Sequence, residues 1–269
     1  MTDRYAVIGN PVAHSKSPLI HKMFAEQTGM DISYEAIEAP LDGFGATVET
    51  LRARGYRGCN VTVPFKFEAF DLATELSARA QMALAVNTLS FDGDIIRGDN
   101  TDGAGLVRDI EENSGIGLRG KRVLLMGAGG AAHGVMLPLL AAGADITIAN
   151  RTAEKAQQLA AKFSGHGNTF ASSYEALAGK QFDVVINATS SSLSDELPPL
   201  PAAIFAPRAL AYDMMYGRET PFMAFAKKNG ATIVADGLGM LVEQAAEAFF
   251  IWRNVRPDTK PVLAKLRAT

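Results

Sequence analysis

Short apolar runs alternate with segments of helical periodicity along most of the chain. In the first third, this pattern predicts strands at 5–8, 33–38 and 58–63 and helices at 18–27, 42–54 and 65–76. Two further apolar runs, 86–91 and 94–97, flank the turn dipeptide Asp92 and Gly93, which is typical of a hairpin. Because hairpin strands are antiparallel, we expect a sheet of mixed direction in this part of the chain.

From residue 121 onward the alternation becomes more regular. It predicts strands at 123–126, 145–149, 182–187, 209–213 and 232–235, and helices at 131–142, 153–162 and 221–229. A further helix is predicted at 103–113, just before this region. After Gly237 an apolar stripe predicts a last helix through Leu238, Leu241, Val242, Ala245, Ala248, Phe249 and Trp252. Such alternation indicates an α/β fold. At about 150 residues a domain, 269 residues suggest two domains.

A glycine-rich turn joins the first of these later strands to its helix. Gly127, Ala128, Gly129 and Gly130 follow the apolar run directly, and Ala131 opens the small-residue helix. A strand, a glycine turn and a helix N-terminus form the unit that binds the pyrophosphate of a dinucleotide. In this interpretation Gly127 permits the tight turn and Gly129 lets a phosphate approach the backbone.

The end of the second strand of this unit bears on which dinucleotide binds. A site for NAD usually carries Asp or Glu there, whereas this chain has Asn150, Arg151 and Thr152, followed by Lys155. The planar guanidinium of Arg151 suits a 2′-phosphate that a carboxylate would repel. We therefore predict NADP(H) rather than NAD(H), the alternative being a solvated strand end. Thr152 is also a candidate N-cap of the following helix.

Composition argues against several classes of protein. The net charge of −3 disfavours non-specific binding to nucleic acid or to an anionic membrane surface. No apolar run approaches the ~20 residues of a membrane helix, and the first residues lack the features of a signal peptide. Cys59 is the single cysteine and the four histidines show no ligand spacing, so we expect no disulfide and no metal. These observations favour a cytoplasmic protein.

Polar residues near two predicted helix starts are candidates for chemistry. Ser15 and Ser17 precede Pro18, so Ser17 is expected to be the N-cap and the two hydroxyls could bind a small carboxylate. Lys66 falls in the first turn of a helix, where the helix dipole disfavours a cation and favours an amine available for acid–base work. Thr62 lies at the end of the preceding strand. Capping, turn formation and solvation are the alternative roles.

For three more polar residues, the role depends on which residues lie near them in the folded protein. Asp102 precedes a helix and is either a cap or the partner of Lys66 in a proton-transfer pair. Asn87 stands at a strand start, as a turn residue or as a donor to a substrate hydroxyl. Gln244 lies in the last predicted helix, where an exposed position is the alternative to a role in a site.

Taken together and in order, these motifs resemble the shikimate dehydrogenase family over essentially the whole chain. The matching segments are 8–18 (IGNPVAHSKSP), 60–66 (NVTVPFK), 85–88 (AVNT), 98–103 (GDNTDG), the glycine turn, 150–152 (NRT), 187–190 (NATS), 212–214 (YDM) and 235–242 (ADGLGMLV). One difference is Ser192, where the family commonly has glycine after a similar NATSS stretch.

The resemblance implies reversible reduction of 3-dehydroshikimate to shikimate by NADPH, on the pathway to chorismate and the aromatic amino acids. By that likeness Lys66 is the catalytic acid–base and Asp102 its partner. Ser15 and Ser17 hold the substrate carboxylate, while Thr62, Asn87, Gln244 and Tyr216 contact the rest of the substrate. Thr189, Met214 and Gly237 flank the nicotinamide.

The resemblance also implies two α/β domains. A substrate domain with a mixed sheet comprises 1–101 and 238–269, because the C-terminal helices return to it, and a Rossmann NADP-binding domain comprises 102–237. The expected active site lies in the cleft between them, and the enzyme is a monomer or homodimer. A quinate/shikimate dehydrogenase of the same family is the nearest alternative, disfavoured by residues 150–152. A catalytically silent NADPH-binding protein and a glycine-loop methyltransferase are more distant alternatives.

Overall fold

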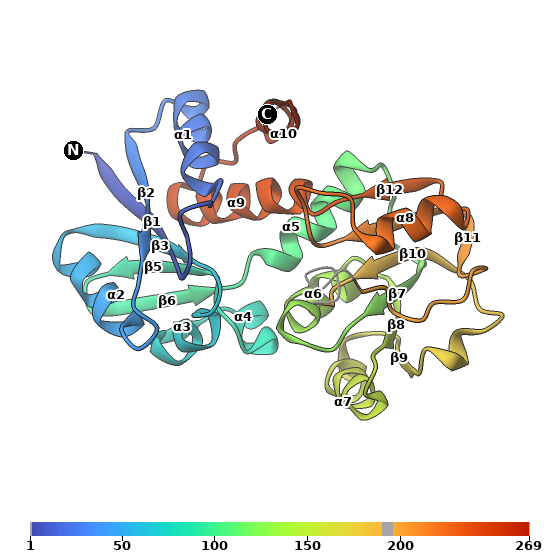
Figure 1. Ribbon diagram of the computed structural model, residues 1–269. Coiled ribbons are helices and arrows are strands. Elements are labelled where there is room, and N and C mark those ends of the chain that lie inside the picture. Colours follow the sequence, from blue (N-terminus) through green and yellow to red (C-terminus); the bar gives the residue numbers. More distant parts are fainter. Residues whose placement is uncertain (1, 190–195, 269) are drawn as a thin grey trace. The chain divides into compact units, whose positions relative to one another are not determined.

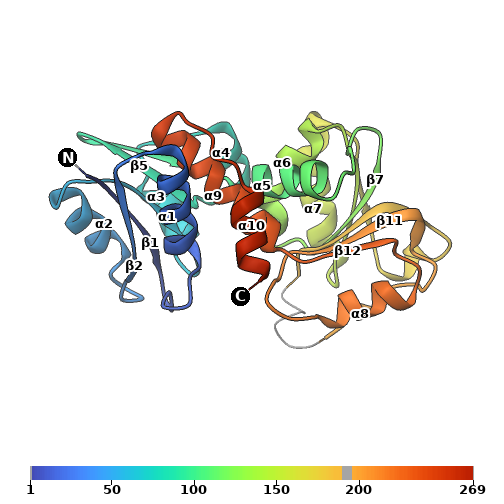
Figure 2. The ribbon, with the colours of Figure 1, turned by 90° about the horizontal axis from the view of Figure 1, so that it is seen from above.

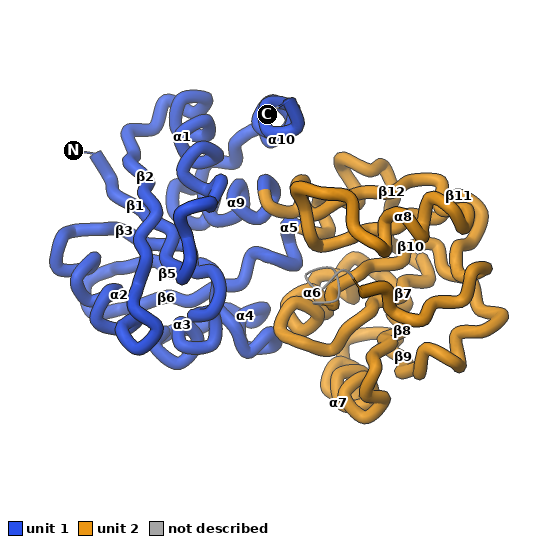
Figure 3. Tube along the Cα trace, viewed as in Figure 1, with its two compact units in different colours: residues 1–105, 242–269 blue, residues 106–241 orange. Residues whose placement is uncertain are grey.

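The chain folds into two compact α/β units. The computed structural model describes residues 2–189 and 196–268 (Figure 1). Unit 1 comprises 1–105 and 242–269, and unit 2 comprises 106–241 (Figure 3). The boundary falls inside two helices, α5 (Asp102–Arg108) and α9 (Leu238–Arg253). The predicted α/β fold class is confirmed, including the return of the C-terminal segment to the first unit.

Unit 1 is built on a six-stranded mixed sheet of order β2-β1-β3-β5-β6-β4. Its strands are β1 (Asp3–Gly9), β2 (Ile32–Glu38), β3 (Tyr56–Val61), β4 (Glu75–Leu76), β5 (Thr88–Asp92) and β6 (Ile95–Asp99). β5 runs antiparallel to β6, as the hairpin prediction required, and it also runs antiparallel to β3. Consequently β1, β3 and β6 end at the same edge of the sheet at which β5 begins.

Helices cover both faces of this sheet. They are α1 (Ser17–Thr28), α2 (Phe44–Ala53), α3 (Lys66–Leu72), α4 (Ala78–Ala83), most of α9, and α10 (Lys260–Arg267). α2 and α3 bury Phe44 and Phe65 against Ile8. On the other face, α1 and α9 pack aromatic rings, and Tyr5 of β1 stacks on Trp252 with ring centroids 4.5 Å apart. Figure 2 shows α1 lying along β1 and β2.

The helix predicted over 65–76 is wrong beyond Leu72. After α3 the backbone becomes extended at Ala73, and Thr74 N donates to Ile96 O at 2.9 Å. Thr74 Oγ1 also accepts from Ile96 N at 2.9 Å. The chain therefore pairs as β4 with β6 and then forms α4, whose N-cap Ser77 accepts from Ala80 N. Because β4 forms by pairing with β6, which lies further along the chain, the residues of β4 show no periodicity from which the strand could be predicted.

Unit 2 has the strand order of a doubly wound dinucleotide-binding fold. Its parallel strands are β7 (Arg122–Met126), β8 (Asp145–Ala149), β9 (Thr169–Ser172), β10 (Phe182–Asn187), β11 (Phe205–Asp213) and β12 (Ile233–Ala235). They lie in the order β9-β8-β7-β10-β11-β12, which is 3-2-1-4-5-6 in chain order. The Rossmann prediction is confirmed, although the pattern missed the edge strand β9.

The helices of unit 2 pack on this parallel sheet. They are α6 (Gly130–Ala141), α7 (Ala153–Phe163) and α8 (Pro221–Lys228), with short 3₁₀ turns at Ser164–His166 and Glu175–Leu177. α5 continues into one π-helical turn, Asp109–Asn113. Phe222 of α8 packs with Leu124 and Val185 in the core. At the other face, α6 and α7 contact β8.

Candidate active site

Lys66 and Asp102 meet at the sheet edge of unit 1 where β3 and β6 end. Lys66 is the first residue of α3, held there by the buried ring of Phe65, and Asp102 is the first residue of α5. Lys66 Nζ donates to Asp102 Oδ2 at 2.5 Å, and both side chains retain partial exposure, 28% and 19%. The backbone N–H of Asp102 donates to Asn100 Oδ1, which fixes the helix start. The structure thus brings the predicted acid–base pair together.

Asn87 holds the other oxygen of the Asp102 carboxylate. Its Nδ2 donates to Asp102 Oδ1 at 2.8 Å, from a position that is 3% exposed. The orientation of this amide is set by the backbone, because Thr101 N donates to Asn87 Oδ1 at 2.9 Å. One carboxylate oxygen therefore faces an amide and the other faces the ammonium group.

Gln244 belongs to the same cluster although it comes 142 positions after Asp102 in the sequence. Asn87 Nδ2 donates to Thr101 Oγ1 at 3.0 Å, and Thr101 Oγ1 donates to Gln244 Oε1 at 3.3 Å. Gln244 therefore contributes its Oε1 to this cluster as an acceptor. The position of Gln244 in this cluster argues against an ordinary exposed helix position.

Sequence reasoning missed three buried polar residues that support this cluster. Thr101 is fully buried, and Thr88 is buried as well; Thr88 Oγ1 donates to Asn87 Oδ1 at 2.9 Å. Asn60 Nδ2 in turn donates to Thr88 Oγ1 at 3.0 Å. Each of the three lies within one of the segments that match the family, at 60–66, 85–88 or 98–103. Their place in these segments is the sequence feature that could have identified them.

Ser15, Ser17 and Thr62 lie in the segments that follow β1 and β3, at the same sheet edge. Thr62 N donates to Ile8 O at 2.9 Å, and a Cβ on Gly9 would lie 2.5 Å from Thr62 Cγ2, so the two segments touch. The prediction that Ser17 is the N-cap of α1 is wrong. Helix α1 begins at Ser17 itself with Lys16 at the cap, because Lys16 already has helical backbone angles. Ser15 Oγ instead accepts from Ser17 N at 3.2 Å.

In unit 2, the glycine turn has the geometry that a pyrophosphate needs. Gly127 has φ +104°, and a Cβ there would lie 3.0 Å from the Ala188 carbonyl oxygen, so the turn requires glycine. Gly129 occupies the N-cap position of α6, and a Cβ there would meet nothing within 4 Å. Gly129, Gly130 and Ala131 are exposed, and Ala128 is half-buried. The N-terminus of the twelve-residue α6 is therefore open to a ligand.

The basic strand end follows β8 in the same unit. Asn150 Nδ2 donates to Thr152 O at 3.0 Å, which folds the segment back on itself. Arg151 and Lys155 are exposed. Thr152 occupies the N-cap position of α7, as predicted, but its side chain makes no capping hydrogen bond. The donor set of this turn and strand end fits a phosphorylated dinucleotide.

Thr189, Met214 and Gly237 lie close together around the ends of β10 and β11. Thr189 N and Oγ1 both donate to Asn187 Oδ1, and Met214 N donates to Asn187 O. A Cβ on Gly237 would lie 2.2 Å from Met214 O. Tyr216 is half-buried in unit 2, where burial raises the pKa of its hydroxyl. Ser190, the end of the NATS motif, and Ser192 lie outside the described residues.

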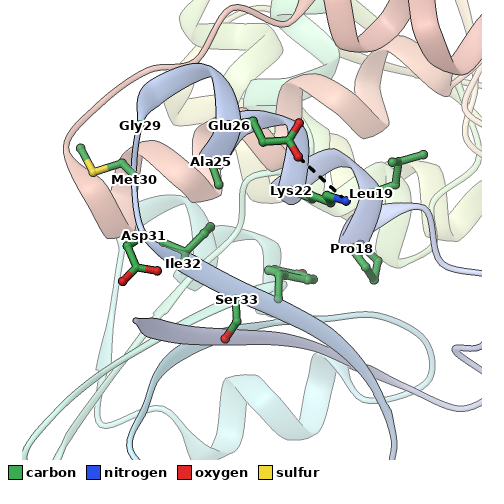
Figure 4. Close-up of a pocket in the computed structure, with 11 residues that line it drawn as sticks. Pro18, Leu19, Lys22, Ala25, Glu26, Gly29, Met30, Asp31, Ile32 and Ser33 are labelled. Carbon is green, nitrogen blue, oxygen red and sulfur yellow. Dashed lines mark ion pairs between the residues drawn. The ribbon is translucent and has the colours of Figure 1, made fainter. Parts of the chain in front are cut away.

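A hollow of about 700 Å³ opens on unit 1 between α1 and the edge strand β2 (Figure 4). Its lining includes Leu19 and Lys22 from α1 and Ser33 from β2, and Lys22 pairs with Glu26 across the helix surface. None of the predicted site residues lines it. The described residues contain no His, Cys, Asp and Glu group suited to a metal ion. Within the same residues, no helix is long and apolar enough to cross a membrane.

Comparison with known proteins finds matches to one family along most of the chain. Residues 7–89 match a family described as the shikimate dehydrogenase substrate binding domain, 109–194 match shikimate/quinate 5-dehydrogenase, and 237–267 match the shikimate 5′-dehydrogenase C-terminal domain. The NADP(+) shikimate dehydrogenase of Methylobacillus flagellatus is 64% identical over 268 residues, covering 99% of each chain.

Solved structures give the same result. A crystal structure of shikimate 5-dehydrogenase from Thermus thermophilus, in complex with NADP(H) and shikimate, superposes with a TM-score of 0.87 at 34% identity, covering 99% of each chain. An enzyme from Pseudomonas putida described as Ael1 superposes with a TM-score of 0.95 at 52% identity, covering 98% of each chain. With both units and all three family matches in agreement, the chain belongs to the shikimate dehydrogenase family.

Proposed function

We propose that this chain is an NADP-dependent shikimate dehydrogenase, which reversibly reduces 3-dehydroshikimate to shikimate in the biosynthesis of chorismate and aromatic amino acids. The observation that carries this proposal is the contact of Lys66 with Asp102, set among Asn87, Thr101 and Gln244. An acid–base pair beside neutral hydrogen-bonding groups suits a small polyhydroxylated substrate. Full-length relatives named as NADP(+) shikimate dehydrogenases support the same reaction.

The proposed chemistry needs one proton at one substrate oxygen. When bound, NADPH would supply the hydride that the carbonyl carbon of 3-dehydroshikimate takes up. Lys66 Nζ gives a proton to the carbonyl oxygen as it becomes a hydroxyl, and takes that proton back in the reverse direction. Asp102 holds the amine through its Oδ2, and Asn87 fixes the carboxylate through its Oδ1, so that neither group has to reorient during proton transfer.

The remaining substrate contacts are assigned mainly to unit 1, with Tyr216 added from unit 2. We assign Ser15 and Ser17 to the substrate carboxylate, and Thr62, Asn87, Gln244 and Tyr216 to its ring and hydroxyls. In the structure Asn87 Nδ2 donates to Asp102 and Thr101, and Gln244 Oε1 accepts from Thr101, which leaves the Gln244 amide nitrogen as its donor group. Gln244 is therefore assigned as a donor to a substrate oxygen.

For the cofactor, we assign the pyrophosphate to Gly127, Ala128, Gly129, Gly130 and Ala131, and the 2′-phosphate to Asn150, Arg151, Thr152 and Lys155. The open N-terminus of α6 and the exposed Arg151 support this assignment. The nicotinamide is assigned to Thr189, Met214 and Gly237. We place substrate recognition in a domain of residues 1–101 and 238–269, and cofactor recognition in residues 102–237.

We further propose a cytoplasmic monomer or homodimer that acts on small molecules and binds neither nucleic acid nor membranes. The net charge of −3 supports the expectation that the protein binds neither nucleic acid nor an anionic membrane surface.

The test is the absorbance of reduced nicotinamide after the protein is mixed with shikimate or quinate, each with NADP or NAD. We expect the fastest initial rate with shikimate and NADP. Faster turnover of quinate with NAD would indicate a quinate/shikimate dehydrogenase instead. If shikimate turnover by the wild type equalled that of Lys66→Ala, a catalytically silent NADPH-binding protein would replace the proposal.

A further inference from the structure

Two buried polar residues at the end of the unit 2 sheet have no role in the assignments above. Asn187 is the last residue of β10 and Asp213 the last residue of β11, and the two are opposite each other in the parallel register. Their side chains are 1% and 0% exposed, and Asn187 Nδ2 donates to Asp213 Oδ2 at 3.1 Å. The pair therefore joins two strand ends at the edge where doubly wound folds bind their ligands.

Asp213 connects this edge to the start of α8. Its Oδ2 also accepts from Thr220 Oγ1 at 2.6 Å, and its Oδ1 accepts from Met215 N at 3.0 Å. Thr220 Oγ1 in turn accepts from Met223 N and so caps α8. A buried carboxylate is costly unless donors surround it. These contacts supply donors and fix the segment from Met214 to Thr220 at both ends.

Asn187 connects the same carboxylate to Thr189. Its Oδ1 accepts from Thr189 N at 3.1 Å and from Thr189 Oγ1 at 2.7 Å. A hydroxyl has one proton, and that of Thr189 is donated to Asn187, so toward a ligand this oxygen acts as an acceptor. The backbone oxygen of Asn187 accepts from Met214 N at 3.1 Å. Thr189 and Met214 are thus both held by Asn187.

We propose that Asp213 and Asn187 are positioning residues for the nicotinamide end of the cofactor. They hold Met214 in place and orient the Thr189 hydroxyl so that its oxygen accepts a hydrogen bond from the carboxamide N–H of nicotinamide. This inference rests on the proposed function only in taking NADP(H) as the ligand. The adenosine end, assigned to Arg151 and the glycine turn, does not depend on the Asp213–Asn187 pair.

The experiment compares two ligands by calorimetry, without turnover. NADPH carries the nicotinamide, whereas adenosine 2′,5′-bisphosphate carries only the adenosine end. In Asp213→Asn, one amide oxygen replaces two carboxylate oxygens that accept hydrogen bonds, so we expect the Kd for NADPH to rise roughly tenfold. In Asn187→Asp, two adjacent carboxylates repel each other, and a similar rise is expected. The Kd for the bisphosphate should stay within about twofold in both variants.

The exchanged pair is the decisive variant. In Asn187→Asp/Asp213→Asn, the carboxylate at 187 accepts from Thr189 and from the new amide at 213, so NADPH affinity should recover to within about threefold of wild type. Asp183→Asn is the matched control, because Asp183 lies at the opposite end of β10 and pairs with Arg122 on the surface.

Equal weakening of both ligands would overturn the proposal and leave a structural role, as would unchanged NADPH affinity in both single variants. If the single variants do not fold, Thr189→Ser and Thr189→Val decide: only the valine variant should lose NADPH affinity, and equal affinities would overturn the proposal. A wild type that binds NADPH but does not turn over shikimate would refute the proposed function alone.

Discussion

Lys66 Nζ donates to one oxygen of the Asp102 carboxylate at 2.5 Å, while Asn87 donates to the other oxygen at 2.8 Å. The carboxylate is thus fixed on both sides before any substrate binds. The amine and the carboxylate side chains both remain partly exposed.

Lys66→Ala should lower kcat for shikimate oxidation by roughly 10²–10⁴-fold, because it removes the group that moves the proton. Initial rates at saturating shikimate and NADP measure the effect. Lys22→Ala is the control, since Lys22 is an exposed lysine of the same unit that forms an ion pair with Glu26 on the surface of α1. Comparable losses in both variants would contradict the role given to Lys66.

Arg151→Ala should weaken NADP binding by roughly 10–100-fold and leave NAD binding nearly unchanged, because the lost contact is a charge-assisted one to the 2′-phosphate. Dissociation constants for the two cofactors give the ratio. An unchanged ratio would remove Arg151 from the cofactor site.

Gly127→Ala and Gly129→Ala should separate folding from binding. At Gly127 the positive φ and the nearby Ala188 carbonyl make alanine strained, so the free energy of unfolding should fall by about 1–3 kcal/mol. At Gly129 the backbone is extended and a Cβ has open space, so stability should hold while NADP affinity falls. Urea unfolding measures the stability of both variants, and calorimetry measures their affinity for NADP. A Gly127→Ala variant as stable as wild type would contradict the strain expected at this position.

His21→Phe should make the protein less sensitive to acid. His21 is fully buried, stacks on Tyr34 with ring centroids 4.1 Å apart, and burial lowers its pKa to about 3. In the unfolded chain the pKa of this histidine is near 6.5. Below that pH the unfolded chain binds a proton that the folded protein does not bind, so the free energy of unfolding falls as the pH falls. From neutral pH to pH 5 this loss is about 2 kcal/mol.

The measurement is urea unfolding of wild type and His21→Phe at both pH values, with His14→Gln as the control because His14 is exposed. The phenylalanine variant should lose about 2 kcal/mol less than wild type on acidification. An equal loss in all three proteins would show that His21 does not contribute.

Local sequence predicted the parts of the fold whose causes are local. The glycine turn of β7 and α6 was recognisable because Gly127, its strand and its helix are contiguous. The β5–β6 hairpin was recognisable because its turn has the right residues. In contrast, β4 exists only through pairing with β6, and nothing near Glu75 indicates that partner.

The residues of the candidate site also fall into those that local sequence could identify and those that it could not. Candidate residues such as Lys66 could be named from their helix position and from the family resemblance. Thr101 accepts from Asn87 and Asn60 donates to Thr88, and both hydrogen bonds join residues that are distant in the sequence. Single-sequence reasoning therefore could not distinguish these three residues from ordinary polar positions. Ser17 was misjudged because the backbone of Lys16, rather than a side chain, begins the helix.

The division of unit 1 into two segments sets an order of events during synthesis. Tyr5 and Leu89 emerge from the ribosome early, yet Trp252, which stacks on Tyr5 and donates to Leu89 O at 3.1 Å, is translated after all of unit 2. Unit 2 can close its sheet while one face of the first sheet is covered by α1 but still lacks α9. The nascent chain therefore carries an exposed aromatic surface until its final helices appear, and chaperones have that interval in which to act.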